Sequence, residues 1–238
     1  MSSRDLIQYL KYKYKNVHLR LHHDDPESLS YYRDLQNFKV QEGEAYPRGR
    51  GIGRAQFDFL TRMGIESSNR IIDIGCGDLR GGRYIIEYVE KGNYMGIDIS
   101  EEAIKRGWKN IKKNDLLEKA PSLRVNEGLR FKEFTVIENF DIVFANSVLT
   151  HLSEEYIAEC FKHLDRVLDK EGQGFFSYNH ASESKSKLTS VASNSNLYRY
   201  PFEELQELGS RHGYRIQYDD YNEHPNENMR MLVIDNND

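Results

Sequence analysis

Short apolar runs alternate with helical stretches along the chain from about residue 70 onward. This alternation is typical of successive strand–helix units around a mainly parallel sheet. The final two runs flank a turn around His224-Pro225-Asn226 and predict an antiparallel hairpin. We therefore expect a three-layer α/β fold with a seven-stranded sheet whose last strand is antiparallel. The expected strands are 70–74, 94–97, 123–125, 140–145, 174–178, 214–218 and 229–234.

Helical periodicity fills the segments between these strands. Ser100 followed by Glu101 and Glu102 predicts a capped helix start, because a serine oxygen accepts a backbone N–H there and acidic residues favour the positive end of a helix. Residues 181–196, rich in Ser, Asn and Lys, predict a mobile loop or lid. Further helices are expected at 82–90, from 153 to about 169, and at 201–212.

Residues 1–66 carry helical patterns and predict an N-terminal helical cap on the substrate side, with the main domain at 67–238. The run Lys11-Tyr12-Lys13-Tyr14-Lys15 has two interpretations. Interleaved lysine and tyrosine can follow a nucleic-acid backbone by charge and stacking. Leu6, Leu10 and Tyr14 instead share the apolar face of an amphipathic helix. The net charge of −5 favours the helix, so no nucleic-acid partner is expected.

Composition narrows the class of protein. The 238 residues are 38% hydrophobic and 12% aromatic, which is enough apolar area for a core. No apolar stretch approaches the roughly 20 residues that cross a bilayer, and the N-terminus lacks the apolar core of a secretory signal. Cys76 and Cys160 form neither a disulfide framework nor a metal-ligand pattern. We expect a soluble cytoplasmic protein without a membrane span.

The strongest chemical signal is the run Ile71-Ile72-Asp73-Ile74-Gly75-Cys76-Gly77-Asp78, in which a buried strand leads into a glycine turn. Glycine lets the backbone approach a ligand closely, because no Cβ intervenes. Asp98 ends the next strand, where a carboxylate can accept hydrogen bonds from both hydroxyls of a ribose. A plain turn with a surface aspartate is the alternative, and it is weakened because both features occur together at the ligand-binding edge of the sheet.

Two classes of cofactor can use such a turn. A dinucleotide fingerprint, G-x-G-x-x-G, places its third glycine where Arg80 stands here. Asp73 would also repel a pyrophosphate, whereas it suits a cationic amino group. These two observations favour S-adenosylmethionine, which has a positive amino end and no phosphate.

Three segments resemble the successive motifs of class I S-adenosylmethionine-dependent methyltransferases. They are Ile71 to Gly77, Gly96-Ile97-Asp98-Ile99-Ser100, and Phe140-Asp141-Ile142-Val143-Phe144-Ala145-Asn146-Ser147-Val148-Leu149-Thr150-His151-Leu152. The likeness covers roughly residues 68–178, and it implies a Rossmann-like fold. The first motif departs from the form D-x-G-x-G-x-G, because Leu79 stands at the third glycine; Gly81 and Gly82 follow one turn later.

The resemblance implies a set of cofactor-binding residues. Asp73, Gly75 and Gly77 would line the methionine end. Asp98 would bind the ribose hydroxyls, and Ile99 would pack on the adenine. The turn Asn126-Glu127-Gly128-Leu129 would flank the adenine, with Glu127 as its polar contact. Asn146 and Ser147 would border the reactive sulfonium.

Two histidines are candidates for a general base, since the ordinary pKa of histidine lies near neutrality. His151 follows the fourth strand, at the mouth of the expected site, and its other interpretation is a helix-capping histidine. His180 follows the fifth strand. His22-His23-Asp24-Asp25 is favoured as a polar turn over a metal site, so no metal is expected.

Arginines supply candidate anion contacts. Arg48, Arg50 and Arg54 precede the first strand, and Arg80 and Arg83 lie beside the glycine turn. Either group can grip a phosphate or carboxylate of the substrate or the carboxylate of the cofactor, or can be ordinary surface charge.

The segment 77–83, taken with the hairpin at His224-Pro225, resembles small bacterial methyltransferases of surface-glycan biosynthesis. The resemblance implies methylation of a hydroxyl or acidic oxygen of a sugar or glycan precursor. The alternatives are O- or N-methylation of a small metabolite or natural product, and a non-catalytic scaffold or sensor that binds the cofactor.

Overall fold

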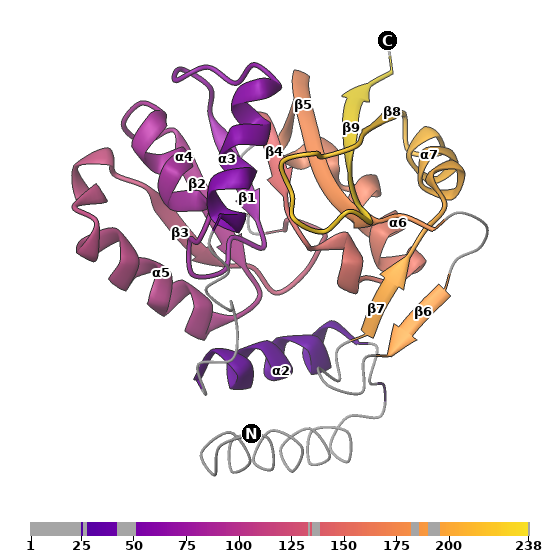
Figure 1. The fold of residues 1–238 in the computed structure, drawn as a ribbon, viewed down its shortest axis with the longest axis horizontal. Coiled ribbons are helices and arrows are strands. Elements are labelled where there is room, and N and C mark those ends of the chain that lie inside the picture. The colour runs from indigo at the N-terminus through magenta and orange to yellow at the C-terminus, as the bar shows by residue number, and fades with distance from the viewer. Residues whose placement is uncertain are drawn as a thin grey trace.

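A seven-stranded mixed sheet organises the protein, with strand order β3-β2-β1-β4-β5-β9-β8 (Figure 1). The computed structural model describes residues 25, 28–41, 51–132, 134, 139–181, 186–189 and 196–237. The strands of this sheet are β1 (Ile71–Ile74), β2 (Tyr94–Asp98), β3 (Ser122–Val125), β4 (Phe140–Ala145), β5 (Leu168–Asn179), β8 (Tyr214–Asp219) and β9 (Met229–Asn236). Each of the seven expected strands is present, so the predicted fold class is confirmed.

The first five strands are parallel, and β9 runs antiparallel to both β5 and β8. Asp73 on β1, an inner strand of the sheet, lies opposite Gly96 on β2 and Phe144 on β4. This register brings the ends of β1, β2 and β4 to the same edge of the sheet. The chemistry-bearing residues that follow those strands therefore meet there.

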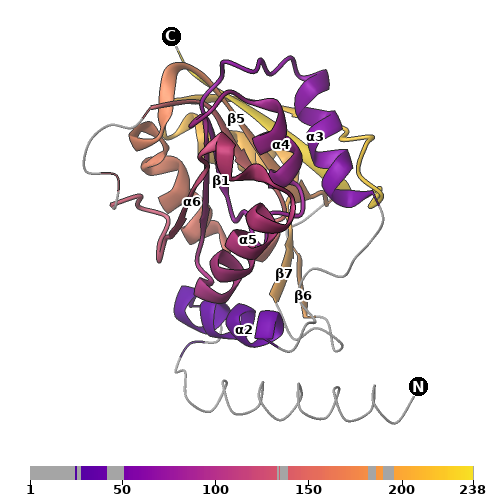
Figure 2. The ribbon, with the colours of Figure 1, turned by 90° about the vertical axis from the view of Figure 1, so that its left-hand side faces the viewer.

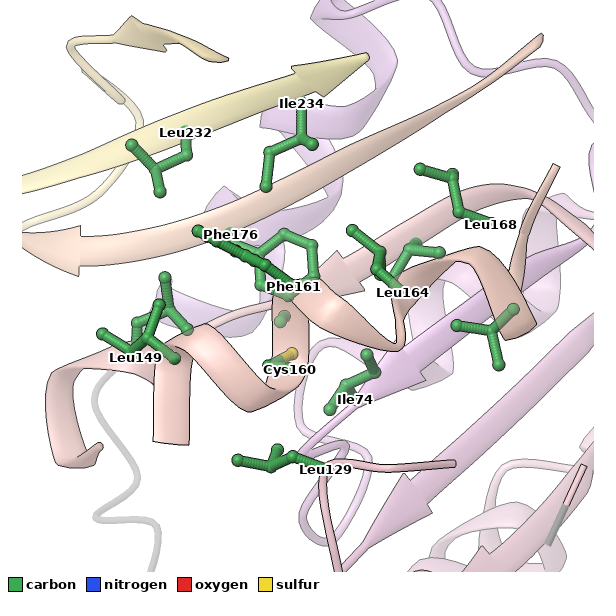
Figure 3. Packing of buried hydrophobic residues seen from close by; sticks show 14 of the residues in the cluster. Ile74, Leu129, Leu149, Cys160, Phe161, Leu164, Leu168, Phe176, Leu232 and Ile234 are labelled. Carbon is green, nitrogen blue, oxygen red and sulfur yellow. The ribbon is translucent and has the colours of Figure 1, made fainter. Parts of the chain in front are cut away.

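Helices cover both faces of the sheet (Figure 2). On one side, α3 (Ile52–Arg62), α4 (Gly82–Tyr88) and α5 (Glu101–Lys113) contribute to one apolar cluster. On the other side, α6 (Glu154–Lys162) and α7 (Phe202–Ser210) contribute to a second. Figure 3 shows the second cluster, in which Phe161 of α6 lies beside Phe176 of β5, and Leu232 of β9 belongs to the same cluster. The result is the expected three-layer arrangement.

The expected helix from 153 to about 169 is wrong in its second half. The chain leaves α6 after Lys162, makes the 3₁₀ turn η3 (Leu164–Arg166), and enters β5 at Leu168. Leu164, Val167 and Leu168 are nevertheless buried in the same cluster as α6. Their spacing continues the helical periodicity of α6 although the backbone has changed, and the apolar pattern alone does not distinguish the two.

The expectation of a mobile loop at 181–196 is also wrong in part. Ser186–Thr189 forms β6, which pairs antiparallel with β7 (Asn196–Arg199) in a separate two-stranded sheet. Backbone hydrogen bonds supply this pairing, so it gives no strong apolar signal in the sequence. The remaining positions of the segment, 182–185 and 190–195, lie outside the described residues.

Helices α2 (Leu29–Gln41) and α3 precede the sheet in the described part of the chain. Asn37 of α2 accepts a 2.7 Å hydrogen bond at Oδ1 from the Ser100 hydroxyl, and Arg106 of α5 donates to the Val40 carbonyl. Ser100 in turn caps α5 by accepting from the Ala103 N–H, which confirms the predicted cap. Helix α2 is thus held against α5, below the sheet in Figure 1.

Some expectations concern residues outside the described part of the chain. These are the amphipathic helix at 6–14, the histidine–aspartate run before Asp25, and Arg48 and Arg50. Among the described residues, no helix has both the length and the apolar character needed to span a bilayer.

Candidate functional site

A cavity of about 660 Å³ opens at the carboxyl ends of β1, β2 and β4. Its volume is in the range of pockets that hold a cofactor or a small ligand. Helices α2 and α3 form further parts of its wall. The sequence-predicted residues that line it are Asp73, Gly75, Gly77, Asp98, Ile99, Asn146, Ser147 and His151.

The turn after β1 depends on glycine for its path. Gly75 and Gly77 have φ of 71° and 58°, in the region that disfavours residues with a Cβ. A Cβ on Gly75 would lie 2.5 Å from Cγ2 of Val148. Leu79, where the common motif has glycine, also has a positive φ of 67°, with its side chain buried. The third position of the turn thus has a left-handed backbone conformation, which favours glycine, although the residue there is leucine.

Asp98 is buried at the end of β2. Its carboxylate accepts hydrogen bonds from the Gly77 N–H at 2.9 Å and the Ser100 N–H at 2.8 Å. Burial raises its pKa to about 6, against the lowering effect of these two bonds. The bonds fix the carboxylate where the glycine turn and β2 meet, at the cavity wall.

Asp73 is the second buried carboxylate of the cavity. The Tyr94 hydroxyl donates a 2.8 Å hydrogen bond to its Oδ2. Burial raises the pKa of Asp73 to about 7, and the charge of Asp98 adds to the rise, while the Tyr94 bond lowers it. A cation placed in the cavity would therefore be favoured beside two carboxylates that have little water around them.

The end of β4 forms the opposite part of the cavity wall. Asn146 accepts a 3.2 Å hydrogen bond from the Tyr221 hydroxyl, and the Ser147 N–H donates to Ser177 Oγ at 2.6 Å. Ser147 has a φ of 61°, a strained conformation for serine that these contacts help to hold. The His151 ring lies 5.2 Å from the Tyr32 ring of α2, measured between centroids. Helix α2 thus closes the cavity over His151.

Residues 72–173 match the family model of a methyltransferase domain. The seven-stranded order and the cavity at the strand ends agree with that match. The chain contains a class I S-adenosylmethionine-dependent methyltransferase domain.

A curated relative of this methyltransferase domain is an uncharacterized methyltransferase of Schizosaccharomyces pombe, 28% identical over 96 residues. That alignment covers 40% of this chain and 34% of the relative, so the chain spans about a third of the length of the curated relative it matches.

Solved structures share the fold. Magnesium protoporphyrin IX methyltransferase from Synechocystis, with bound S-adenosylhomocysteine, superposes with a TM-score of 0.66 at 17% identity, over 87% of this chain and 99% of the other. The Burkholderia thailandensis 1,6-didemethyltoxoflavin N1-methyltransferase gives 0.65 at 14% identity, over 89% and 91%. The DhpI complex with S-adenosylhomocysteine gives 0.61 at 17% identity, over 89% and 96%.

Two predicted site residues of the methyltransferase domain do not line the cavity. Glu127 is exposed and lies 4.0 Å from Arg33, whereas its neighbours Asn126 and Gly128 do line it. His180 contacts the Tyr178 ring edge-on at 6.1 Å, and its backbone N–H bonds to the Asn228 carbonyl. The structure therefore does not bring His180 together with His151.

The candidate arginines differ in whether they line the cavity. Arg80 lines the cavity. Arg54 instead pairs with Asp58, and Arg83 lies over the Tyr84 ring. Among the described residues, no group of three or more His, Cys, Asp or Glu side chains could hold a metal ion.

Sequence reasoning missed several lining residues of the methyltransferase cavity. They are Leu29, Tyr32, Gln36 and Lys39 of α2, Ile52 and Gln56 of α3, and His224 between β8 and β9. The turn at His224 is visible in the sequence, but nothing local indicates that it faces the strand ends. The α2 residues carry only a helical pattern.

Proposed function

We propose that this methyltransferase transfers the methyl group of S-adenosylmethionine to an oxygen of a small acceptor, a hydroxyl or acidic oxygen of a sugar or glycan precursor. One observation carries the proposal. A single cavity joins the buried carboxylates Asp73 and Asp98 at one part of its wall to His151 at another.

The residues present fit an adenosyl cofactor. The glycine turn, in which a Cβ at Gly75 would collide with Val148, lies beside Asp98, which would accept from the ribose hydroxyls. Asp73 would face the amino group, with Gly75 and Gly77 along the methionine end. Ile99 would pack on the adenine face. When bound, the cofactor supplies an electrophilic methyl group on a sulfonium.

Asn126 is a better candidate than Glu127 for the polar contact to the adenine. Its side chain is buried, and its Oδ1 has no hydrogen-bond partner among the described residues. A buried carbonyl oxygen without a donor is costly, and an exocyclic amine would satisfy it. Asn126 lines the cavity, whereas Glu127 points its charge toward solvent and Arg33.

The chain's own contribution to methyl transfer is alignment, exclusion of water and removal of a proton. Asn146 and Ser147, held by Tyr221 and Ser177, would border the reacting atoms. His151 would accept the proton of the acceptor hydroxyl, and Tyr32 of α2 would keep water from that region. His180 does not line the cavity, so we assign the base to His151.

Methylation of another small metabolite or natural product is the second candidate. The solved neighbours named as methyltransferases of 1,6-didemethyltoxoflavin and of magnesium protoporphyrin IX favour it, since both names are those of small molecules. The same cavity serves either acceptor class.

Calorimetric titration with S-adenosylmethionine, S-adenosylhomocysteine and NADPH tests the cofactor. Micromolar binding of the first two alone is expected, and binding of NADPH alone would overturn the proposal. Formation of S-adenosylhomocysteine with panels of sugars, sugar acids and small metabolites then tests transfer. Tight cofactor binding without turnover on any panel would indicate a non-catalytic scaffold or sensor instead.

A further inference from the structure

His224 lines the cavity from the turn between β8 and β9. Its Nδ1 accepts a 3.1 Å hydrogen bond from the backbone N–H of Asn226. A backbone N–H can only donate, so Nδ1 carries no proton in this arrangement. The proton of the neutral ring therefore resides on Nε2.

The charge state of this ring follows from its surroundings. Burial lowers the pKa of His224, against the raising effect of the hydrogen bond with the Asn226 backbone, and the positive charge of Arg80 lowers it further. At neutral pH the ring is uncharged, with Nε2–H as a donor. His224 is thus suited to hold an oxygen of a ligand, and it is not suited to accept a proton from one.

The turn that carries His224 is anchored on two sides. Tyr221 is buried, packs its ring 5.0 Å from that of Phe59, and bonds to Asn146. Arg62 of α3 pairs with both Asp219 and Glu223. The ring of His224 is therefore presented from a fixed loop, and donor geometry in a fixed loop needs little ordering when a ligand binds.

Arg80 lines the same cavity from the turn after β1. Helix α3 packs closely against it, since a Cβ on Gly53 would lie 2.2 Å from the Arg80 carbonyl oxygen. Arg80 and His224 both line the cavity, and the charge of Arg80 lowers the pKa of both Tyr221 and His224. A cation with several donors and a neutral N–H donor thus line one cavity.

We propose that Arg80 and His224 form a carboxylate-binding corner of the cavity. The guanidinium supplies charge and planar donors for a carboxylate, and His224 Nε2–H supplies a further donor. The inference rests on the proposed methyl transfer, and it identifies the chemistry of one ligand group. That carboxylate belongs either to the methionine end of the cofactor or to the acceptor.

A matched pair of ligands separates the two sources. S-adenosylmethionine and decarboxylated S-adenosylmethionine differ only in the carboxylate. If the corner holds the cofactor, Arg80→Gln and His224→Ala weaken binding of the first by about tenfold or more, as expected for hydrogen bonds to a charged group. Binding of the decarboxylated form then stays within about twofold of wild type. His224→Gln, which keeps a side-chain N–H donor, recovers part of the affinity.

If the corner holds the acceptor, neither variant changes the affinity for either ligand. Malonate then binds the wild-type protein saturated with S-adenosylhomocysteine and shifts the His224 ring resonance in NMR spectra. In Arg80→Gln, malonate does not bind and the His224 resonance does not shift. Arg83→Gln, an exposed neighbour outside the cavity, is the control and behaves as wild type in both experiments.

Two results overturn the corner. One is equal weakening of both adenosyl ligands in Arg80→Gln and His224→Ala, which indicates a structural role. The other is unchanged affinity for S-adenosylmethionine together with no malonate binding. Failure of the wild-type protein to bind either adenosyl ligand is distinct from both, since it overturns the proposed function and the corner with it.

Discussion

The Tyr94 hydroxyl reaches the Asp73 carboxylate at 2.8 Å because Gly82 has no side chain. A Cβ on Gly82 would lie 2.2 Å from that hydroxyl oxygen. The three residues come from β2, β1 and the start of α4. The glycine that follows the cofactor turn thus orients a carboxylate of the cavity through a tyrosine, without touching the carboxylate itself.

Gly82→Ala is expected to lower the free energy of unfolding by about 1–3 kcal/mol, because the buried Tyr94 ring has no open space to move into. Urea denaturation followed by circular dichroism measures the change. Gly128→Ala is the matched control, since a Cβ there meets nothing within 4 Å. Equal stability of the two variants would contradict the role of Gly82.

Asp73 makes the stability of the ligand-free protein fall as pH rises between about 4 and 7. Its pKa is raised from 3.8 to about 7 in the folded state, so the folded protein holds a proton that the unfolded chain has lost in this range. The stabilisation is fully present below the unfolded pKa and is lost as pH rises through the folded one. A shift of this size corresponds to a few kcal/mol.

Asp73→Asn is expected to reduce this pH dependence, since asparagine keeps an oxygen for the Tyr94 hydroxyl and does not ionise. A smaller slope remains, because the pKa of Asp98 is also raised, to about 6. Thermal unfolding from about pH 5 to pH 8 measures the difference from wild type. A wild-type slope that persists in the variant would assign the titration to another group.

Asp98→Ala is expected to weaken S-adenosylhomocysteine binding by about tenfold or more while the fold is retained, because a carboxylate that accepts from ribose hydroxyls is lost. Calorimetry measures the affinity and circular dichroism the fold. Asp115→Asn, an exposed aspartate beyond α5, serves as the control. Unchanged affinity in Asp98→Ala would refute the ribose assignment.

His151→Ala and His180→Ala form a matched pair for the base. His151 lines the cavity and His180 does not, so only the first variant is expected to reduce turnover, by about 10²–10⁴-fold. Both should bind S-adenosylhomocysteine as the wild-type protein does. Steady-state assays with the best acceptor measure the turnover of both variants. A larger loss of turnover in His180→Ala than in His151→Ala would instead assign the base to His180.

Local sequence patterns determined the sheet and the carboxylate–glycine part of the cavity. Buried runs such as 71–74 and 140–145 form strands in any similar context, and parallel strands end at one edge of their sheet. Asp73, Gly75 and Asp98 could therefore be placed together from their positions at strand ends. The cap at Ser100 is equally local, because its bond spans only to Ala103.

Tertiary structure alone decided which distant segments complete the cavity. Tyr32 of α2 and His224 of the β8–β9 turn reach it through packing between segments far apart in the chain, for which no local pattern exists. It also decided that residues 164–168 leave the helix and that 186–189 pair as a strand, because the backbone conformation there does not follow from the apolar pattern. The sequence also did not determine which side chain after β3 faces the cavity. Asn126 lines it, whereas the next residue, Glu127, faces solvent and Arg33.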